Sequence, residues 1–448
     1  MNPSAFREYD IRGKYPNDLN GETVYELGLS IGTYLREKGA KRISLGRDCR
    51  LSSPELHAAL LKGLTETGTD IVDLGMVPTP LLYFSIHHLN TDGGIQITGS
   101  HNPPDENGFK ICLGTGSVYG EEVQKIREIG ESGRFQKGHG KVEHSEVITP
   151  YLAYLKKNIA PGDLKRKVVI DAGNGVGGLA APDVYRAMGV EVTEIFCEPD
   201  GNFPNHHPDP TIPANLTRLI REVSERSADL GISFDGDADR IGVVDREGKI
   251  IWGDQLMIIF SRDILERTPG AEIIGEVKCS QALYDDIKKH GGTPVMWKAG
   301  HSLIKSRMKE DHAAFAGEMS GHLFFADRYF GYDDAIYAGA RLLEILTRKA
   351  VTVRDLLAGV PNMVNTPEIR MDCPDENKFD VVARLVEAFK KEYDVIDIDG
   401  ARVLFESGWG LVRASNTQPV LVLRFEAENE ERLLEIKELF MKKVNEFI

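Results

Sequence analysis

The segment 235–240 carries three alternating aspartates, and this is the strongest chemical signal in the sequence. It follows the apolar stretch 230–234, which reads as a buried strand. Alternate residues of an extended segment project to the same side, and three converging carboxylates repel one another unless a hard cation lies among them. The positions where an EF-hand requires Gly and Glu hold Arg240 and Arg246, so we expect Mg²⁺ rather than Ca²⁺. The predicted ligands are Asp235, Asp237 and Asp239.

A serine near the tip of a stiff turn offers a second kind of chemistry. Residues 93–97 alternate apolar and polar side chains, as a strand does. Gly99 then permits unusual backbone angles, and Pro103 and Pro104 restrict the exit, so we expect Ser100 to be held rigidly. A hydroxyl held in this way is placed to attack a substrate or to carry a group. An ordinary polar turn explains the same residues when they are considered alone.

A third loop suits the recognition of sugar hydroxyls. Glu318, Ser320 and His322 alternate between two glycines, and together they supply the donors and acceptors that hydroxyls need. His301 lies at the end of a predicted strand, where a lone histidine is more often structural than catalytic.

A fourth loop, 413–419, suits a phosphate group. An arginine fork, two hydroxyls and an amide lie between two predicted strands and make a phosphate cradle. Considered alone, the loop fits a polar β-turn equally well. The candidate ligands are Arg413, Ser415, Asn416 and Thr417.

The stretch 173–178 fits the G-x-G-x-x-G fingerprint of dinucleotide-binding enzymes. It lies between a predicted strand and a predicted helix, so a dinucleotide-dependent oxidoreductase is an alternative function. The acidic residues that follow, at 191, 194 and 198, occupy no distinctive position for a ribose contact. We therefore interpret these glycines as a tight strand–helix turn.

Three strand–helix–strand units must position the first three loops. They span residues 42–74, 167–196 and 272–297, and each is followed by a strand that ends in one of the polar loops. The repeat predicts three related α/β domains with mixed sheets sandwiched by helices. Strands near 401–406 and 420–426, with a helix over 428–447, predict a smaller α+β C-terminal domain with an antiparallel sheet. The expected domains are 1–149, 150–253, 254–366 and 367–448.

Composition limits the range of partners. The 448 residues carry a formal charge of −15, which argues against nucleic acid and anionic membranes. No apolar run is long enough to span a bilayer, and the five cysteines without paired spacing suggest a reducing cytoplasm. No obligate protein partner is evident. An anionic small substrate requires a local cationic pocket set against the overall charge.

The four loops together resemble the signature loops of the α-D-phosphohexomutases, and most closely those of the bacterial phosphomannomutase/phosphoglucomutase branch. They occur in the order of that family, one in each expected domain, and the resemblance covers essentially the whole chain. It implies reversible phosphoryl transfer between the 1- and 6-positions of mannose or glucose phosphates, in a central cleft. It also implies a phosphoserine enzyme, Mg²⁺, and glucose or mannose 1,6-bisphosphate as intermediate and activator.

The same resemblance assigns roles to individual residues. Ser100 would carry the phosphoryl group and share the metal with the three aspartates, and residues of the third and fourth loops would hold the sugar and its second phosphate. Further residues would supply charge, contacts and proton transfer. They are Tyr9, Arg12, Lys110, Arg240, His301 and His322.

Two other functions compete with a mutase. Phe234-Asp235-Gly236-Asp237 resembles the opening of phosphatases that use an aspartate nucleophile, and Asp333-Asp334 would serve as their later acidic motif. That function gives Ser100 and the Arg413 loop no role, and release of free phosphate would distinguish it. A sugar-phosphate sensor without catalysis would bind its ligand but would acquire no phosphate on Ser100.

Overall fold

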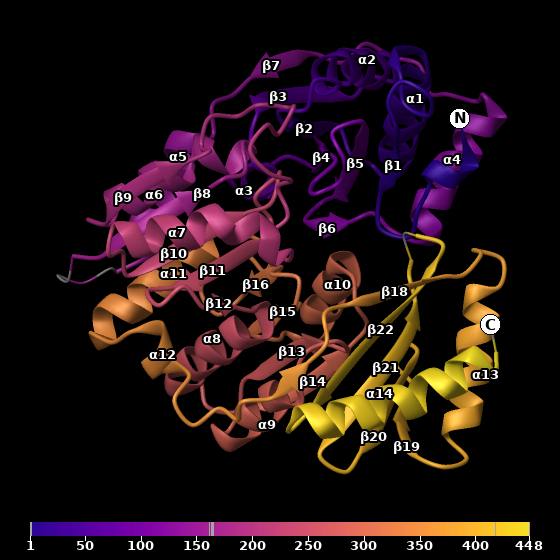
Figure 1. Ribbon diagram of the computed structural model, residues 1–448. Coiled ribbons are helices and arrows are strands. Elements are labelled where there is room, and N and C mark those ends of the chain that lie inside the picture. The colour runs from indigo at the N-terminus through magenta and orange to yellow at the C-terminus, as the bar shows by residue number, and fades with distance from the viewer. Residues whose placement is uncertain (1, 161, 163–164, 417, 448) are drawn as a thin grey trace.

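The part of the chain that the structure describes folds into four β-sheets that follow one another along the sequence (Figure 1). The structure is a computed structural model, and it describes residues 2–160, 162, 165–416 and 418–447. The first three sheets are mixed and the fourth is antiparallel, as the sequence predicts. Within the described residues, no helix is long and apolar enough to cross a membrane.

The first sheet has helices on both faces. Its strand order is β1-β5-β4-β2-β3-β7, and β6 pairs with β5. Helices α1 and α2 pack over one face, and α3 packs over the other. The strands are β1 (Ile11–Lys14), β2 (Arg42–Arg47), β3 (Asp70–Met76), β4 (Gly93–Ile97), β5 (Glu106–Leu113), β6 (Gly116–Ser117) and β7 (Val142–His144). The helices are η1 (Pro3–Ala5), α1 (Gly21–Glu37), α2 (Ser53–Glu66), α3 (Thr79–His88) and α4 (Glu121–Ser132).

The second and third sheets share a continuous apolar core with the α3 side of the first. Their strand orders are β12-β11-β10-β8-β9 and β14-β13-β15-β16. The second unit contains α5 (Ile148–Asn158), β8 (Lys167–Asp171), η2 (Val176–Leu179), α6 (Ala181–Ala187), β9 (Glu191–Ile195), η3 (Pro213–Leu216), α7 (Thr217–Glu225), β10 (Leu230–Phe234), β11 (Ile241–Asp245) and β12 (Ile250–Ile251). The third contains α8 (Gly253–Arg267), β13 (Glu272–Glu276), α9 (Gln281–Lys289), β14 (Thr293–Trp297), α10 (His301–Asp311), β15 (Phe315–Gly317), β16 (Leu323–Phe325), α11 (Ala335–Lys349) and α12 (Val353–Leu356).

The three predicted repeats have the same local design. In each, a helix ends at a glycine with a positive φ, directly before the next strand of the sheet. Gly68, Gly189 and Gly291 take φ values of 83°, 82° and 79°. A left-handed residue stops a helix by satisfying its last carbonyls, and glycine adopts this conformation without strain.

The repeats also share one topology, and this topology brings the polar loops together. The spatial orders β5-β4-β2-β3, β11-β10-β8-β9 and β16-β15-β13-β14 are equivalent, with the first strand of each antiparallel to its neighbour. The loops 98–105, 235–240 and 318–322 each connect the two antiparallel strands of this set. They therefore occupy the same position in three related sheets.

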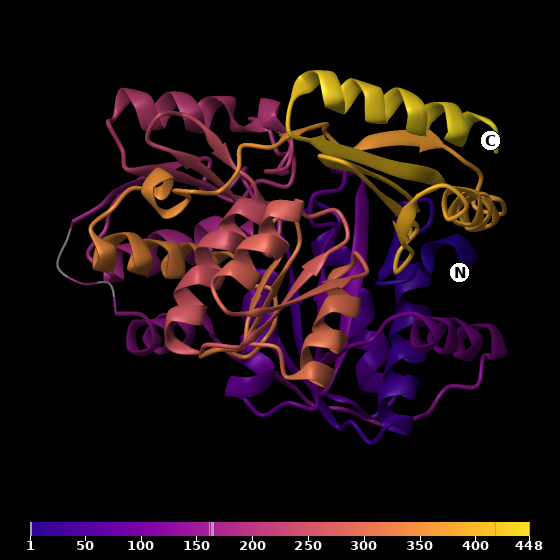
Figure 2. The same cartoon turned by 90° about the horizontal axis from the view of Figure 1, so that it is seen from below.

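The fourth sheet has a core of its own, covered on one face by α13 and α14 (Figure 2). Phe389 of α13 stacks on Phe440 of α14 at 4.5 Å between ring centroids. The strand β21 is not apparent from the sequence, because two glycines obscure its alternation. Arg413 belongs to this strand rather than to a loop. The elements are β17 (Val364–Asn365), β18 (Ile369–Asp372), α13 (Lys378–Phe389), β19 (Asp394–Ile396), β20 (Ala401–Phe405), β21 (Gly408–Ala414), β22 (Val420–Ala427) and α14 (Glu430–Asn445).

Candidate active site

The Ser100 loop and the aspartate loop meet directly, although 135 residues separate them. Ser100 is buried and adopts a left-handed backbone conformation with φ 49°. Its Oγ donates a 2.6 Å hydrogen bond to Asp235 Oδ2 and lies 3.1 Å from Nδ1 of His101. The predicted rigidity of this loop has a local basis, because Thr98 Oγ1 accepts the amide of Ser100 and Asp48 accepts the amide of Gly99.

The three predicted metal ligands form one buried cluster. Asp235, Asp237 and Asp239 are all 0% exposed, and one oxygen of each lies within 4.8 Å of the others. Lys110 Nζ donates to Asp239 and, at 2.7 Å, to Asp237. Thr79 donates a 2.5 Å hydrogen bond to Asp237 from the first helical turn of α3.

The cluster has the donor set of a cation site. Among the described residues, Oδ1 of Asp237 and Oδ1 of Asp239 are buried without a hydrogen-bond donor. Burial and the two neighbouring carboxylates raise the pKa of Asp235 well above its usual value. Burial alone would also raise the pKa of Asp237, but the charge of Lys110 holds that pKa below its usual value. Unsatisfied carboxylate oxygens of this kind fit a hard divalent cation.

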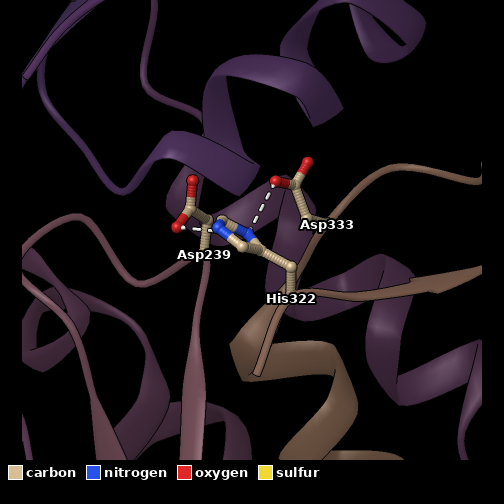
Figure 3. Close-up of side chains that lie close together, drawn as sticks. All are labelled: Asp239, His322 and Asp333. Atoms are coloured by element: carbon tan, nitrogen blue, oxygen red, sulfur yellow. Dashed lines mark ion pairs between the residues drawn. The ribbon is translucent and has the colours of Figure 1, made fainter. Parts of the chain in front are cut away.

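His322, Asp239 and Asp333 form a second buried group with metal-ligand character (Figure 3). Its hydrogen bonds favour a different interpretation. Arg240 Nε donates to His322 Nε2 at 2.9 Å, and a guanidinium cannot accept, so Nε2 carries the lone pair. The proton of the neutral ring is then on Nδ1, which lies 3.0 Å from Asp333 and 3.6 Å from Asp239. We therefore interpret this group, the histidine relay, as a histidine oriented by close contacts with two carboxylates rather than as a metal centre.

Asp333 is the common partner of three basic groups of the site. Besides His322, it accepts a 3.0 Å hydrogen bond from Lys305 and lies 3.8 Å from His301 Nδ1. The His301 ring is stacked on His322 at 5.5 Å, and neither of its nitrogens has a hydrogen-bond partner among the described residues. Burial and the charge of Lys305 hold the pKa of His301 well below its usual value, so the ring is neutral.

The third loop joins this group from β15 and β16. Glu318 is buried, its backbone amide bonds His322 O, and its Oε1 accepts the amide of Gly300 at 2.8 Å. Gly321 takes a φ of 94°, and any Cβ there would lie 2.3 Å from Ile241 O, so the loop requires glycine at this position. Ser320 is partly exposed at the loop tip.

The fourth loop reaches the others through Tyr9. Asn416 donates to the Tyr9 hydroxyl, which itself donates to Ala299 O at 2.8 Å. Arg413 Nε donates to Asp399 at 2.8 Å, and Ser415 Oγ accepts the amide of Gln418. Thr417, a predicted phosphate ligand, lies outside the described residues.

Arg12 completes the set of predicted cations. Its Nε donates to Asp10 at 2.6 Å, and its Nη1 donates to Asn102, two residues after Ser100, at 3.0 Å. The predicted site residues that are described thus lie in one network formed by the four sheets. Ser320 contributes by its position on the third loop.

The stretch 173–178 is a turn that supports the aspartate loop from behind. A Cβ at Gly175 would lie 2.5 Å from Gly236 O, and one at Gly177 would crowd Ala238. Val176 N also donates to Gly236 O at 3.0 Å. These glycines therefore serve close packing between two loops, as the interpretation of a tight turn expects, and they leave the oxidoreductase alternative without support.

Several residues of the network were missed by the sequence analysis or given another role. Thr79 and Lys305 are single polar residues on helices, and no sequence pattern connects them with the loops. Lys278 follows β13, is partly buried, and its Nζ lies 3.3 Å from Glu368, near Arg413. Asp333 and Asp334 are explained by the histidine relay and by capping of α11, so they do not support the phosphatase alternative.

Comparisons with known proteins identify the family. Four family models described as phosphoglucomutase/phosphomannomutase match consecutive parts of the chain. Alpha/beta/alpha domains I, II and III match residues 3–137, 149–248 and 252–363, and the C-terminal domain matches residues 368–443.

Similar proteins match over nearly their whole length. A phosphomannomutase/phosphoglucomutase of Pseudomonas aeruginosa is 48% identical over 438 residues, which are 98% of this chain and 94% of that protein. A phosphoglucomutase of Neisseria gonorrhoeae is 46% identical over 442 residues, 97% and 95% of the two chains. The crystal structure of a phosphoglucomutase/phosphomannomutase family protein from Burkholderia thailandensis superimposes with a TM-score of 0.92 at 42% identity, covering 99% of this chain and 97% of that one. The chain therefore belongs to the phosphoglucomutase/phosphomannomutase family of the α-D-phosphohexomutases.

Proposed function

We propose that this protein interconverts the 1- and 6-phosphates of hexoses of the glucose and mannose type. Ser100 is phosphorylated, donates its phosphoryl group to the free end of a hexose phosphate, and recovers a phosphoryl group from the other end. A hexose 1,6-bisphosphate is the intermediate and, when added, the activator. The observation that carries this proposal is the 2.6 Å contact of Ser100 Oγ with Asp235, inside a cluster that also holds Lys110.

The surroundings of Ser100 suit phosphoryl transfer, which depends on positioning and on neutralising charge. Lys110, Arg12 and Arg240 supply positive charge within or beside the loop. Asp235, Asp237 and Asp239 would hold Mg²⁺ together with an oxygen of the group on Ser100. When bound, Mg²⁺ supplies charge neutralisation for the phosphoryl oxygens.

The remaining two loops would hold the ends of the sugar. Glu318 and Ser320 offer an acceptor and a small donor to adjacent hydroxyls, with His322 beside them. Arg413, Ser415 and Asn416, with Thr417, would bind the phosphate that does not react. Tyr9 supports this arrangement, because it contacts the loop that precedes His301 and also Asn416.

The transfer requires one proton movement in each direction. When the P–O bond to Ser100 breaks and a P–O bond to the sugar forms, the sugar hydroxyl releases its proton. His301 is neutral and has unpartnered nitrogens among the described residues, so we assign it to proton transfer. The departing Ser100 oxygen takes up a proton by way of Asp235, its hydrogen-bond partner. In the return step the Ser100 hydroxyl releases that proton toward Asp235, and His301 returns the first proton to the departing sugar oxygen.

The domain organisation that accompanies this proposal follows the predicted boundaries. We assign the Ser100 loop to residues 1–149, the aspartate loop to 150–253, the sugar loop to 254–366 and the phosphate loop to 367–448. The four matched family regions fall within or close to these ranges.

The test is the transfer of phosphate to Ser100. Wild-type protein incubated with glucose 1,6-bisphosphate should gain the mass of one phosphoryl group, and peptide mapping should locate it on Ser100. Ser100→Ala should gain no phosphate and lose nearly all mutase turnover, whereas the exposed Ser132→Ala should behave as wild type. Wild-type-like turnover of Ser100→Ala would refute the mechanism. Release of free phosphate as the main product would favour a phosphatase instead.

A further inference from the structure

Arg50 is a buried arginine that binds the backbone of the Ser100 loop. Its side chain is 0% exposed. Nη1 donates to the carbonyl oxygens of Pro103 at 2.5 Å and Glu106 at 2.9 Å. Nη2 donates to those of Ser100 at 2.8 Å and Asn102 at 2.6 Å. One guanidinium thus donates hydrogen bonds to four carbonyl oxygens of a single short loop.

These contacts determine the shape of the loop. Between residues 99 and 106 the described backbone makes only two hydrogen bonds within the loop, from Asn102 N to Gly99 O and from Glu106 N to Pro103 O. The guanidinium lies against the backbone at Gly99, where a Cβ would be 2.4 Å from Arg50 Nε. The left-handed conformation of Ser100 is unfavourable for a residue with a side chain, so it persists only where the surroundings impose it.

The contact at Ser100 O also orients the next amide. In a trans peptide the carbonyl and the N–H group point in opposite directions, so the N–H of His101 is directed away from Arg50. In the part of the chain that the structure describes, this amide donates to no protein acceptor. It is therefore free to donate to an anionic group carried on Ser100.

A loop of the second unit holds the other side of Arg50. The ring of Phe203 lies 5.2 Å from the guanidinium carbon, and Gly201 packs so closely that a Cβ would be 2.5 Å from Cys49 O. Asp48 holds both the backbone and the side chain of Arg50, since it accepts a hydrogen bond from the Arg50 amide at 3.0 Å and forms an ion pair with Arg50 Nε at 3.2 Å. The guanidinium is thus held between the Ser100 loop and the segment that precedes the metal loop in sequence.

We propose that Arg50 is a positioning residue for phosphoryl transfer, which rests on the proposed role of Ser100. Its guanidinium holds Ser100 in the left-handed conformation that aims Oγ at Asp235, and Phe203 keeps it in place. Lysine carries the same charge but has one compact donor group, so it cannot bind four carbonyls in this geometry.

The experiment compares Arg50→Lys with Arg166→Lys, a control chosen for its similar contacts. Arg166 is also buried and also donates to two carbonyls, those of Leu346 and Val351, but it lies away from the Ser100 loop. We expect Arg50→Lys to lower kcat by about 100-fold, the loss typical of a misplacement near 1 Å. KM for glucose 1-phosphate should change by less than about threefold, because the Arg413 loop is intact. Arg166→Lys should retain kcat within about threefold.

Two further readouts separate positioning from stability. The phosphorus-31 resonance of the phosphoserine, formed with glucose 1,6-bisphosphate, should shift in Arg50→Lys and stay unchanged in Arg166→Lys. Phe203→Leu keeps Arg50 and should lower kcat by about tenfold. Equal kcat values for Arg50→Lys and Arg166→Lys, or an unshifted resonance in Arg50→Lys, would overturn the proposal. If Arg50→Lys does not fold, an unchanged kcat in Phe203→Leu would overturn it. If the wild type gains no phosphate on Ser100, both this inference and the proposed function fail.

Discussion

At the scale of single residues, the cations of the site are held by the protein's own carboxylates. Arg12 pairs with Asp10, and Arg413 pairs with Asp399. In a chain of charge −15, this pairing keeps positive groups in place where an anionic substrate would bind. A bound phosphate would add charge-assisted hydrogen bonds to an arginine that is already oriented.

Arg413→Ala tests this role for the fourth loop. If Arg413 binds the non-reacting phosphate, the substitution removes bonds worth roughly 1.5–3 kcal/mol and lowers kcat/KM by roughly 10- to 150-fold. Phosphorylation of Ser100 by a donor that does not use this loop should be less affected. Steady-state kinetics on hexose 1-phosphates provide the measurement, with Arg432→Ala of the same domain as control. An unchanged kcat/KM for Arg413→Ala would place the phosphate elsewhere.

The aspartate cluster makes a prediction about metal binding. Mg²⁺ should raise the Tm of metal-stripped wild type, because it binds only the folded cluster. Asp237→Asn removes one ligand charge and should reduce this increase strongly. Asp245→Asn, in the same sheet but outside the cluster, should retain it. Full mutase activity after complete removal of divalent metals would contradict the assignment of these aspartates as metal ligands.

At the scale of secondary-structure elements, α11 is attached to the site through its N-cap. Asp334 accepts the amide of Tyr337 at 2.8 Å and the hydroxyls of Tyr151 and Tyr329. The preceding residue, Asp333, is the hub of the histidine relay. Packing of this helix start therefore determines where the relay lies.

Asp334 also predicts a pH dependence of stability. Burial raises its pKa to about 6, whereas in the unfolded chain it is ~3.9. Between these two pKa values the folded protein keeps a proton that the unfolded chain has already released. The resulting contribution to the free energy of unfolding, ~3 kcal/mol, is complete below pH ~4 and is lost as the pH rises through 6. The Tm of wild type relative to Asp334→Asn should fall between pH 4 and 7. Glu428→Gln, at an exposed position, should show no such trend, and a rising difference for Asp334→Asn would contradict the assignment.

At the scale of the whole molecule, one strand arrangement is used three times to bring polar loops to a common point. The fourth sheet has a separate core and joins the third through arginines. Arg402 donates to the carbonyls of Val277 and Cys279, and Arg424 contacts the sugar loop at Met319. Under the proposed function, the sugar and its distant phosphate would thus be bound by different domains around the Ser100 loop.

This arrangement predicts similar activity on glucose and mannose phosphates. Glu318 and Ser320 lie on one short loop and would read adjacent hydroxyls, for which the 3- and 4-hydroxyls shared by both sugars are suited. A pocket that fits C2 closely in one orientation of the sugar would bind it less well in the other orientation. We therefore expect weak discrimination between the two sugars at C2. Values of kcat/KM for glucose 1-phosphate and mannose 1-phosphate should agree within about tenfold, or ~1.4 kcal/mol.

The same comparison includes sugars that the site should reject. A 2-acetamido sugar should react poorly because of its bulk, and a galactose-type epimer should be rejected at C4. A hundredfold preference between glucose and mannose, or best activity on N-acetylglucosamine 1-phosphate, would contradict the prediction.

The sequence alone was sufficient for what depends on local order. Strand periodicity, helix-ending glycines and the alternating polar loops predict the three repeats, the α+β C-terminal domain and the residues with the right chemistry, because each signal lies within a few neighbouring residues. The strand of residues 408–414 was missed because its glycines break the alternation.

Only the tertiary structure decided which of these groups meet. Lys110 reaches Asp237 across 127 residues, and Asp333 gathers His322 and Lys305 from separate elements. Arg50, in the turn before α2, donates to the carbonyl of Ser100, and no sequence motif predicts this contact. Such contacts follow from the packing of whole sheets and helices. A local sequence pattern does not indicate which distant residue will be in contact with it in the folded protein.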